Sequence, residues 1–317
     1  MTRPFRTAIV LSLASVALVG AQGRQTNAPV PNDAATVFVT VSRTGERTGR
    51  YTAAPLALPP DGSKYTLTRF DFDVRDDGEG REVLESSTNL PLTIALLVDM
   101  SPSIGRLEWV AKLPGDLAHA LGPDDRISIT RFADTTVSTP FTQDAAALEA
   151  AGRDLRDAMK LRNGPSPIWD VVNTTITALA KEPGRPAIVL FSDGRVTGNL
   201  TRFEFVMQHA LAASVTFYGV LEGMPVFQGY IPSRPSLPEP WRNPRRLAVA
   251  TGGQLVPEPD NAGNLKDTLI QFIRELRGGY RLRFKPYKPD GKPHPLSIRI
   301  RTPGFLVRGP ESYTPPR

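Results

Sequence analysis

The segment that most constrains the fold is a nearly uninterrupted apolar run, Leu92–Val98, which ends at the acidic residue Asp99. A strand buried on both faces of a parallel sheet has this composition, because helices cover it from both sides. Further strands are predicted at residues 126–132, 186–191, 214–220 and 254–256. Helical spacing of apolar residues occurs between these strands, so the chain predicts an α/β fold with a doubly wound, mainly parallel sheet flanked by helices.

Strands of another kind are predicted on both sides of this region, in segments that are β-branched and aromatic or that alternate at period two. They lie at residues 35–41, 70–75, 280–284 and 296–300. We expect residues 35–88 to form the first part of a small antiparallel β module, ahead of an α/β domain at residues 89–278. Residues 279–317 are predicted to form a C-terminal β-hairpin that pairs with this module. The module is then built from both ends of the chain.

The first residues have the layout of an export signal. Arg3 and Arg6 precede an apolar run from Ala8 to Val19, and small residues follow as far as Ala21. The run is shorter than the roughly 20 residues that cross a bilayer, so residues 1–21 are predicted to be a cleaved signal peptide. Residues 22–34 are predicted to be a flexible lead-in. We therefore expect a secreted or periplasmic protein that is not an integral membrane protein after cleavage.

Composition narrows the classes of function. The chain contains no cysteine, so neither disulfides nor a thiol nucleophile are available, and its three histidines are scattered without a recognisable catalytic partner. We therefore expect no enzyme activity; a hydrolase would need a nucleophile that no motif reveals. The net charge of +6 is concentrated late in the chain, where basic residues recur at period two and are interpreted as the solvent-facing positions of strands. No nucleic acid partner is expected.

Oxygen-bearing side chains follow two of the predicted parallel strands. Asp99, Ser101 and Ser103 come directly after the first strand, and Asp193 follows the strand at residues 186–191. Ligands of open parallel sheets bind at the carboxyl ends of strands, and carboxylate and hydroxyl oxygens suit a hard divalent cation. Ser166, which precedes a predicted helix, is a further candidate, although a serine in this position can equally be a helix cap. Mg²⁺ is the expected cation, with Mn²⁺ or Ca²⁺ as alternatives.

The stretch Leu96-Leu97-Val98-Asp99-Met100-Ser101-Pro102-Ser103 resembles the Asp-x-Ser-x-Ser motif of von Willebrand factor type A domains. The resemblance extends from about Leu92 to Arg277, and the flanks are similar to bacterial secreted proteins of the acidobacterial von Willebrand type. It implies a metal-ion-dependent adhesion site in which Ser166 stands in the place of the family's threonine and Asp193 in that of its third-loop aspartate. It also implies a coordination position that an acidic side chain of a protein partner fills.

The resemblance and the motif together predict an exported protein that binds a protein partner through this cation site. Phe227 and Tyr230, in a proline-rich loop at residues 222–240, and Trp241 at its end are the candidate partner-contacting aromatics. The alternative is a structural or assembly protein that keeps the scaffold without a functional metal site. Pro102 and Pro165, which depart from the usual motif, are the residues that favour this alternative.

Overall fold

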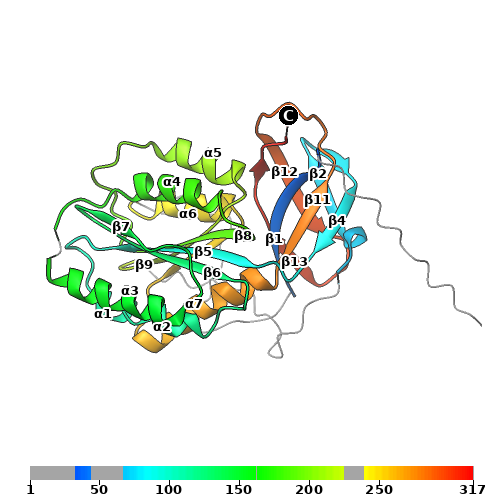
Figure 1. Ribbon diagram of the computed structural model, residues 1–317. Coiled ribbons are helices and arrows are strands. Elements are labelled where there is room, and N and C mark those ends of the chain that lie inside the picture. Colours follow the sequence, from blue (N-terminus) through cyan, green and yellow to red (C-terminus); the bar gives the residue numbers. More distant parts are fainter. Residues whose placement is uncertain (1–32, 44–66, 162, 225–238, 317) are drawn as a thin grey trace, which may run out of the picture.

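The computed structural model describes residues 33–43, 67–161, 163–224 and 239–316. The predicted signal peptide, the lead-in up to residue 32, and the two aromatic residues Phe227 and Tyr230 lie outside these ranges. The molecule has two lobes, an α/β lobe and an all-β lobe (Figure 1). The predicted fold class, a mainly parallel sheet flanked by helices with an antiparallel β module from both chain ends, is confirmed.

The α/β lobe is built on a six-stranded sheet with the order β10-β9-β8-β5-β6-β7. Its strands are β5 (Leu92–Asp99), β6 (Arg126–Phe132), β7 (Thr136–Ser138), β8 (Arg185–Ser192), β9 (Thr216–Leu221) and β10 (Gln254–Pro257). All neighbours are parallel except the edge pair β6 and β7. Every residue of β5 is buried, as its uninterrupted apolar composition predicts for a central strand.

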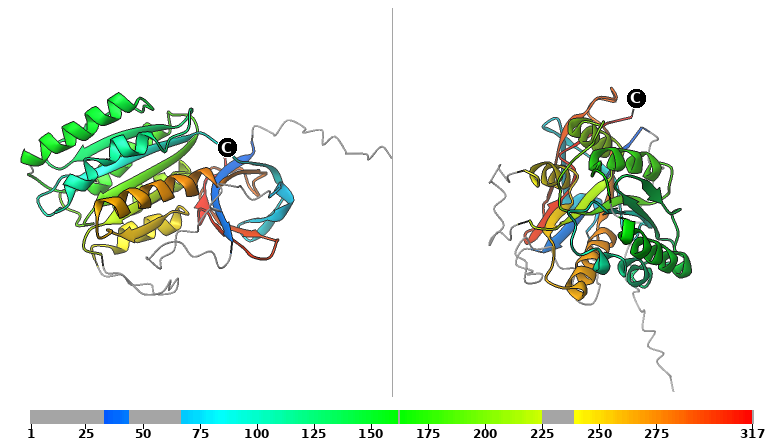
Figure 2. Two further views of the ribbon diagram at one scale, coloured as in Figure 1. Left: turned by 90° about the horizontal axis from the view of Figure 1, so that it is seen from below. Right: turned by 90° about the vertical axis from the view of Figure 1, so that its left-hand side faces the viewer.

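Seven helices cover the two faces of this sheet within the described ranges. They are α1 (Leu107–Val110), α2 (Leu113–Ala118), α3 (Ala145–Ala158), α4 (Ile168–Leu179), α5 (Phe203–Ala212), α6 (Arg242–Ala250) and α7 (Ala262–Arg277). Separate short 3-10 turns precede β2 at Arg69–Asp71 and follow α3 at Met159–Leu161. α4, α5 and α6 pack on one face, and α1, α2, α3 and α7 on the other (Figures 1 and 2). The helix expected at residues 107–121 is divided into α1 and α2 close to Pro114, which lacks the N–H that a continuous helix needs.

The order of the strands creates a switch point beside β5. From β5 the chain passes to β6 on one side, and β8, which comes later, lies on the other side of β5. The connections that leave the carboxyl ends of β5 and β8 therefore run to opposite faces of the sheet. Open α/β sheets bind ligands in the crevice that such a divergence leaves. Asp99 ends one of these two strands and Asp193 directly follows the other.

The β module consists of two four-stranded sheets, with the orders β13-β1-β11-β4 and β14-β12-β2-β3. Its strands are β1 (Ala35–Arg43), β2 (Phe72–Asp76), β3 (Glu79–Arg81), β4 (Val83–Ser87), β11 (Tyr280–Phe284), β12 (His294–Ile300), β13 (Phe305–Arg308) and β14 (Ser312–Tyr313). Asp77 and Gly78 join β2 to β3, and both have positive φ. This is the two-residue turn that matches the twist of a hairpin.

The predicted C-terminal hairpin between residues 280 and 300 is wrong. β11 pairs with β1 and β4, whereas β12 pairs with β2 and β14, so the two segments lie in different sheets. The chain between them crosses from one sheet to the other, and Asp76 anchors the crossing by accepting a hydrogen bond of 2.6 Å from the backbone N–H of Tyr287. Alternation at period two cannot distinguish a hairpin from two strands in different sheets, because in both arrangements each strand has one buried face.

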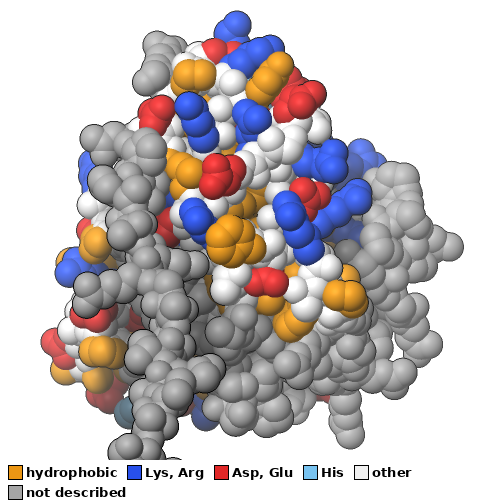
Figure 3. All heavy atoms as spheres, turned by 90° about the vertical axis from the view of Figure 1, so that its right-hand side faces the viewer, with side chains coloured by type: hydrophobic (Ala, Val, Ile, Leu, Met, Phe, Trp, Pro, Cys, Tyr) orange, Lys and Arg blue, Asp and Glu red, His pale blue; other side chains and the backbone are white. Residues whose placement is uncertain are grey.

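Basic and acidic side chains are interspersed on the visible face of the β module (Figure 3). Arg281 and Arg283 of β11, for example, both form ion pairs with Glu85 of the neighbouring β4. The basic composition near the carboxyl end of the chain is therefore partly compensated in the fold. None of the helices in the described ranges is both long enough and apolar enough to span a bilayer.

Candidate functional site

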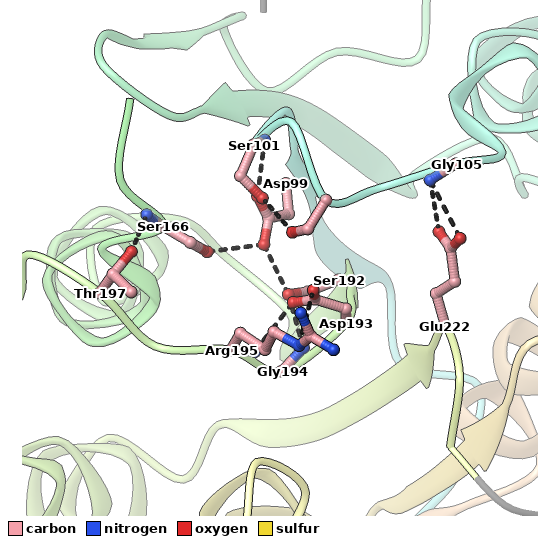
Figure 4. A network of polar contacts seen from close by, with 11 residues as sticks. Asp99, Ser101, Gly105, Ser166, Ser192, Asp193, Gly194, Arg195, Thr197 and Glu222 are labelled. Atoms are coloured by element: carbon pink, nitrogen blue, oxygen red, sulfur yellow. Dashed lines mark hydrogen bonds and ion pairs between the residues drawn. The ribbon is translucent and has the colours of Figure 1, made fainter. Parts of the chain in front are cut away.

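Asp99 lies at the centre of the polar contacts at the switch point, with none of its surface exposed (Figure 4). Its Oδ1 accepts a hydrogen bond of 2.9 Å from the backbone N–H of Ser101. Its Oδ2 accepts hydrogen bonds of 2.6 Å from the hydroxyls of Ser166 and Ser192. No ion pair in the described part of the chain involves Asp99. A buried carboxylate without a compensating positive charge is costly, which makes this position favourable for a cation.

The two serines that donate to Asp99 differ in what remains free on their hydroxyls. Ser192 Oγ also accepts a hydrogen bond of 3.0 Å from the backbone N–H of Gly194. Ser166 Oγ, in contrast, accepts no hydrogen bond from any described residue, although Ser166 is only 2% exposed. A hydroxyl that has given its proton to a carboxylate retains two lone pairs. Ser166 therefore has an oxygen available to a cation, whereas Ser192 holds Asp99 and the Gly194 turn in place.

The sequence left open whether Ser166 caps a helix. Pro167 is the N-cap residue of α4, and no side chain from its own segment caps this helix end. Asn199, from the loop after β8, instead accepts a hydrogen bond of 2.6 Å from the backbone N–H of Trp169 in the first turn. The Ser166 side chain points to Asp99 and not to the helix (Figure 4).

Ser101 and Ser103 have the spacing of two neighbouring ligands of one cation. Their Oγ atoms are 3.2 Å apart. Two adjacent ligands at about 2.1 Å from an octahedral Mg²⁺ lie about 3 Å from each other. Ser101 is buried, and Ser103 is exposed, so the pair reaches from the interior to the surface. These hydroxyls, with Ser166 and the carboxylates of Asp99 and Asp193, form an all-oxygen donor set that fits a hard divalent cation.

Asp193 and Arg195 form the surface side of this cluster. Asp193 Oδ1 accepts a hydrogen bond of 2.9 Å from the backbone N–H of Arg195, and its Oδ2 lies 3.6 Å from Arg195 Nε. Gly194 between them has a φ of +79°, which favours glycine, and a Cβ there would lie 3.3 Å from the carbonyl oxygen of Pro240. In the described ranges, no group of three or more carboxylate, imidazole or thiol side chains could hold a metal. The candidate donor set therefore combines two carboxylates with serine hydroxyls.

A second loop, at residues 194–201, supports the Ser166 segment through contacts that the sequence analysis missed. Thr197 Oγ1 accepts a hydrogen bond of 2.7 Å from the backbone N–H of Ser166, and the Thr197 N–H donates to Ser166 O at 3.0 Å. Gly198 lies so close to Pro165 that a Cβ on the glycine would be 2.8 Å from the proline Cβ. Pro165 therefore packs against this loop.

Asp170 completes this support from the first turn of α4. Its carboxylate accepts hydrogen bonds from the backbone N–H groups of Leu200 and Thr201, at 2.9 and 2.6 Å. Burial tends to raise the pKa of Asp170, but the hydrogen bonds from Thr201 and Leu200 outweigh it and hold that pKa below its usual value. Thr197 and Asn199, which hold the Ser166 segment and the start of α4, look like ordinary solvent-facing loop residues in the sequence. No local sequence pattern therefore predicts these hydrogen bonds.

Trp241, the one candidate partner-contacting aromatic within the described ranges, lies at the N-cap of α6. Its side chain is half-buried, packs against the core under α4, α5 and α6, and approaches Gly194 of the site. Trp241 thus supports the turn that carries Asp193, and its predicted contact with a partner remains a prediction.

Two further carboxylates follow the next strands of the sheet. Glu222 comes directly after β9, and both of its oxygens accept hydrogen bonds from the backbone N–H of Gly105, at 2.9 and 3.0 Å. Glu258 follows β10, with its Oε2 3.6 Å from Arg106 Nε. The Glu258 side chain is 6% exposed, and its Oε1 has no hydrogen-bond partner in the described ranges. Burial, reinforced by the charge of Glu222 and opposed by Arg106, raises the pKa of Glu258 to about 7.

This shift predicts a pH-dependent stability that a Glu258→Gln variant lacks. The folded protein holds a proton on Glu258 up to about pH 7, whereas the unfolded chain releases it near 4.5, so the free energy of unfolding falls as pH rises between these values. The whole effect is at most about 3 kcal/mol. We expect Glu258→Gln to be more stable than wild type at pH 8 and equal to it at pH 4.5, in urea melts across this range. Glu239→Gln, at an exposed position, should follow the wild-type profile, and a Glu258→Gln profile parallel to wild type would contradict the assignment.

Comparisons with known proteins find similar solved structures at low sequence identity. No family model matches the chain, and no curated protein matches it. The structure of an aerotolerance-related membrane protein from Bacteroides fragilis is 16% identical, covers 57% of this chain and 98% of that one, and gives a TM-score of 0.43. The protein BatB from Bacteroides thetaiotaomicron is 18% identical, with coverages of 58% and 98% and a TM-score of 0.43.

A third similar structure is proximal thread matrix protein 1 from the mussel byssus, solved with a zinc-occupied MIDAS motif. It is 15% identical, with a TM-score of 0.45, and the match covers 62% of this chain and 48% of that chain. The ligand proposed for the present site is therefore argued from the oxygen atoms of the Asp99 cluster alone.

Proposed function

We propose that the protein is a binding module that holds a divalent cation at the switch point and uses it to bind an acidic side chain of a partner protein. The observation that carries the proposal is the Asp99 cluster. A fully buried carboxylate that has no ion-pair partner among the described residues receives two serine hydroxyls, and one of these, Ser166, accepts no hydrogen bond from the described part of the chain. The resemblance of the Asp99-x-Ser101-x-Ser103 motif to the adhesion site of von Willebrand factor type A domains supports the same function.

Ser101, Ser103 and Ser166 would hold the cation through their hydroxyl oxygens, and Asp99 and Asp193 would balance its charge, directly or through those hydroxyls and water. When bound, the cation supplies a positive centre that accepts a carboxylate oxygen of the partner. Neutral hydroxyls are weaker ligands than carboxylates, so we expect moderate affinity and exchange of the outermost ligand. We further propose that the protein is exported, that Mg²⁺ is its usual cation and that it has no catalytic activity.

Titration calorimetry with Mn²⁺ tests the cation site. Wild-type protein should bind one Mn²⁺, and a Ser101→Ala, Ser103→Ala double variant should bind it at least about tenfold more weakly, since each lost ligand removes roughly 1 kcal/mol or more. Ser138→Ala is the matched control and should bind as wild type does, because its hydroxyl lies on the edge strand β7, where it pairs with Thr130 and with no residue of the Asp99 cluster. Equal heats for the double variant and wild type would overturn the proposed site.

A further inference from the structure

The loop at residues 194–201, which begins directly after Asp193, carries an apolar side chain that the fold does not bury. Leu200 is 95% exposed, more than any other large hydrophobic residue among those described. Its backbone is nevertheless held by the hydrogen bond to Asp170, in a loop that also contacts the Ser166 segment through Thr197 and Gly198. The side chain thus contributes nothing to the core while its backbone is held by hydrogen bonds. A fixed, exposed apolar side chain beside a binding site is suited to contact a partner, because its loop needs little ordering on binding.

The same loop carries a positive charge next to the cation site. The Arg195 side chain is 72% exposed, and the one ion pair it forms in the described part of the chain is with Asp193 at 3.6 Å. Its backbone N–H is bound to the same carboxylate, so Arg195 is attached to the site at two points. Figure 4 shows its guanidinium beside Asp193, at the edge of the Asp99 cluster.

The charges of the loaded site indicate what it attracts. The two negative charges of Asp99 and Asp193 balance a divalent cation, so in the loaded site Asp193 no longer neutralises the guanidinium of Arg195. Glu222 keeps its negative charge, but both of its oxygens are bound to the backbone N–H of Gly105, and Glu258 pairs with Arg106, so neither carboxylate pairs with Arg195. A partner that offers only one carboxylate, bound at the cation, provides no second negative charge to pair with Arg195. A segment with a second acidic side chain satisfies both positive centres.

We propose that the loop at residues 194–201 is the specificity surface of the module, and that it selects an acidic peptide segment. One carboxylate of this segment binds at the cation, a second pairs with Arg195, and a neighbouring apolar side chain packs on Leu200. This inference rests on the proposed function and adds the chemistry of its partner. Arg195 and Leu200 recognise the partner, and neither of them holds the cation.

A phage-displayed library of random dodecapeptides, selected on the full protein in Mn²⁺, tests the inference. Peptides eluted by EDTA should contain two acidic residues close to an apolar one. For the tightest synthetic peptide, Arg195→Glu should weaken binding at least about tenfold, with a steeper loss at low salt, as expected for a charge at the rim of an interface. Leu200→Ser should weaken it about fivefold, since an apolar contact is lost. Arg202→Glu and Val249→Ser are the matched controls and should bind as wild type does.

The Mn²⁺ affinity of Arg195→Glu separates this inference from the function on which it rests. The substitution adds a negative charge beside Asp193, so Mn²⁺ should bind as tightly as to wild type or more tightly, while the peptide binds more weakly. If wild type binds no Mn²⁺, the proposed function fails. If Mn²⁺ binds and the selected peptides carry only a single acidic residue, or if Arg195→Glu and wild type bind the peptide equally, the specificity surface is wrong and the cation site stands.

Discussion

An Asp99→Asn variant is expected to melt at the same temperature in Mn²⁺ and in EDTA, whereas Mn²⁺ should raise the melting temperature of the wild-type protein clearly. A ligand that binds only the folded state stabilises it by about 2.7 kcal/mol at a hundred times its dissociation constant. For a chain of this size that corresponds to a shift of roughly 4 °C. Asparagine keeps the shape of Asp99 but removes the negative charge that the cation requires, so the shift should vanish.

The variant is expected to fold, which keeps this result interpretable. Hydrogen bonds to Ser101, Ser166 and Ser192 weaken when the carboxylate becomes an amide, but the cost of burying an unpaired negative charge disappears as well. Asp154→Asn is the matched control, because its carboxylate is 55% exposed and lies in α3, outside the cluster. Differential scanning fluorimetry in both buffers measures the shift. A full Mn²⁺ shift in Asp99→Asn would show that the cation binds somewhere else.

The parallel sheet and the placement of Asp99 were predictable because both follow from patterns local in the chain. The apolar run of β5 requires cover on two faces, and parallel neighbours place the ends of β5 and β8 at one edge. The convergence of Asp99 with Ser166 is a weaker inference from sequence, since 67 positions separate them. The structure joins them through a loop whose backbone is fixed by Thr197 and Asn199, and the composition of that loop gives no sign of this role.

The hairpin predicted between residues 280 and 300 is wrong for the same reason, because contacts distant in sequence decide the pairing of its two strands. β11 and β12 each alternate, and alternation specifies which face of a strand is buried without specifying its neighbour. The choice of sheet is made by contacts distant in sequence, such as the pairing of β11 with β1 near residue 37 and the hydrogen bond from Tyr313 to Asp76. Glu258 was overlooked for a comparable reason, because its burial and the charge of Glu222 are properties of the folded sheet edge and not of either segment.

Arg185, at the start of β8, is fully buried where the parallel sheet meets the β module. Its guanidinium donates hydrogen bonds to the carbonyl oxygen of Leu276 at 2.8 Å and to the hydroxyl of Thr40 in β1 at 3.2 Å. Gly279 passes so close that any side chain there would collide with the guanidinium. Burial lowers the pKa of Arg185 to about 10, so the side chain remains charged at neutral pH. One arginine thus joins a strand of the sheet to β1 and to the end of α7.

An Arg185→Ala variant should therefore destabilise the protein by about 3–5 kcal/mol. The substitution leaves a cavity, and it leaves buried hydrogen-bond acceptors in both lobes without a donor. Arg185→Met, which refills most of the volume, should lose about half as much, and Arg126→Ala, at an exposed position, very little. All three tryptophans lie in the α/β lobe, so tryptophan fluorescence reports that lobe while circular dichroism reports both. The two signals should coincide in urea melts of wild type and separate in Arg185→Ala, since the β module loses its tie to the sheet. Coincident transitions at unchanged stability would mean that packing alone joins the lobes, and that the charged network around Arg185 contributes nothing to their cooperativity.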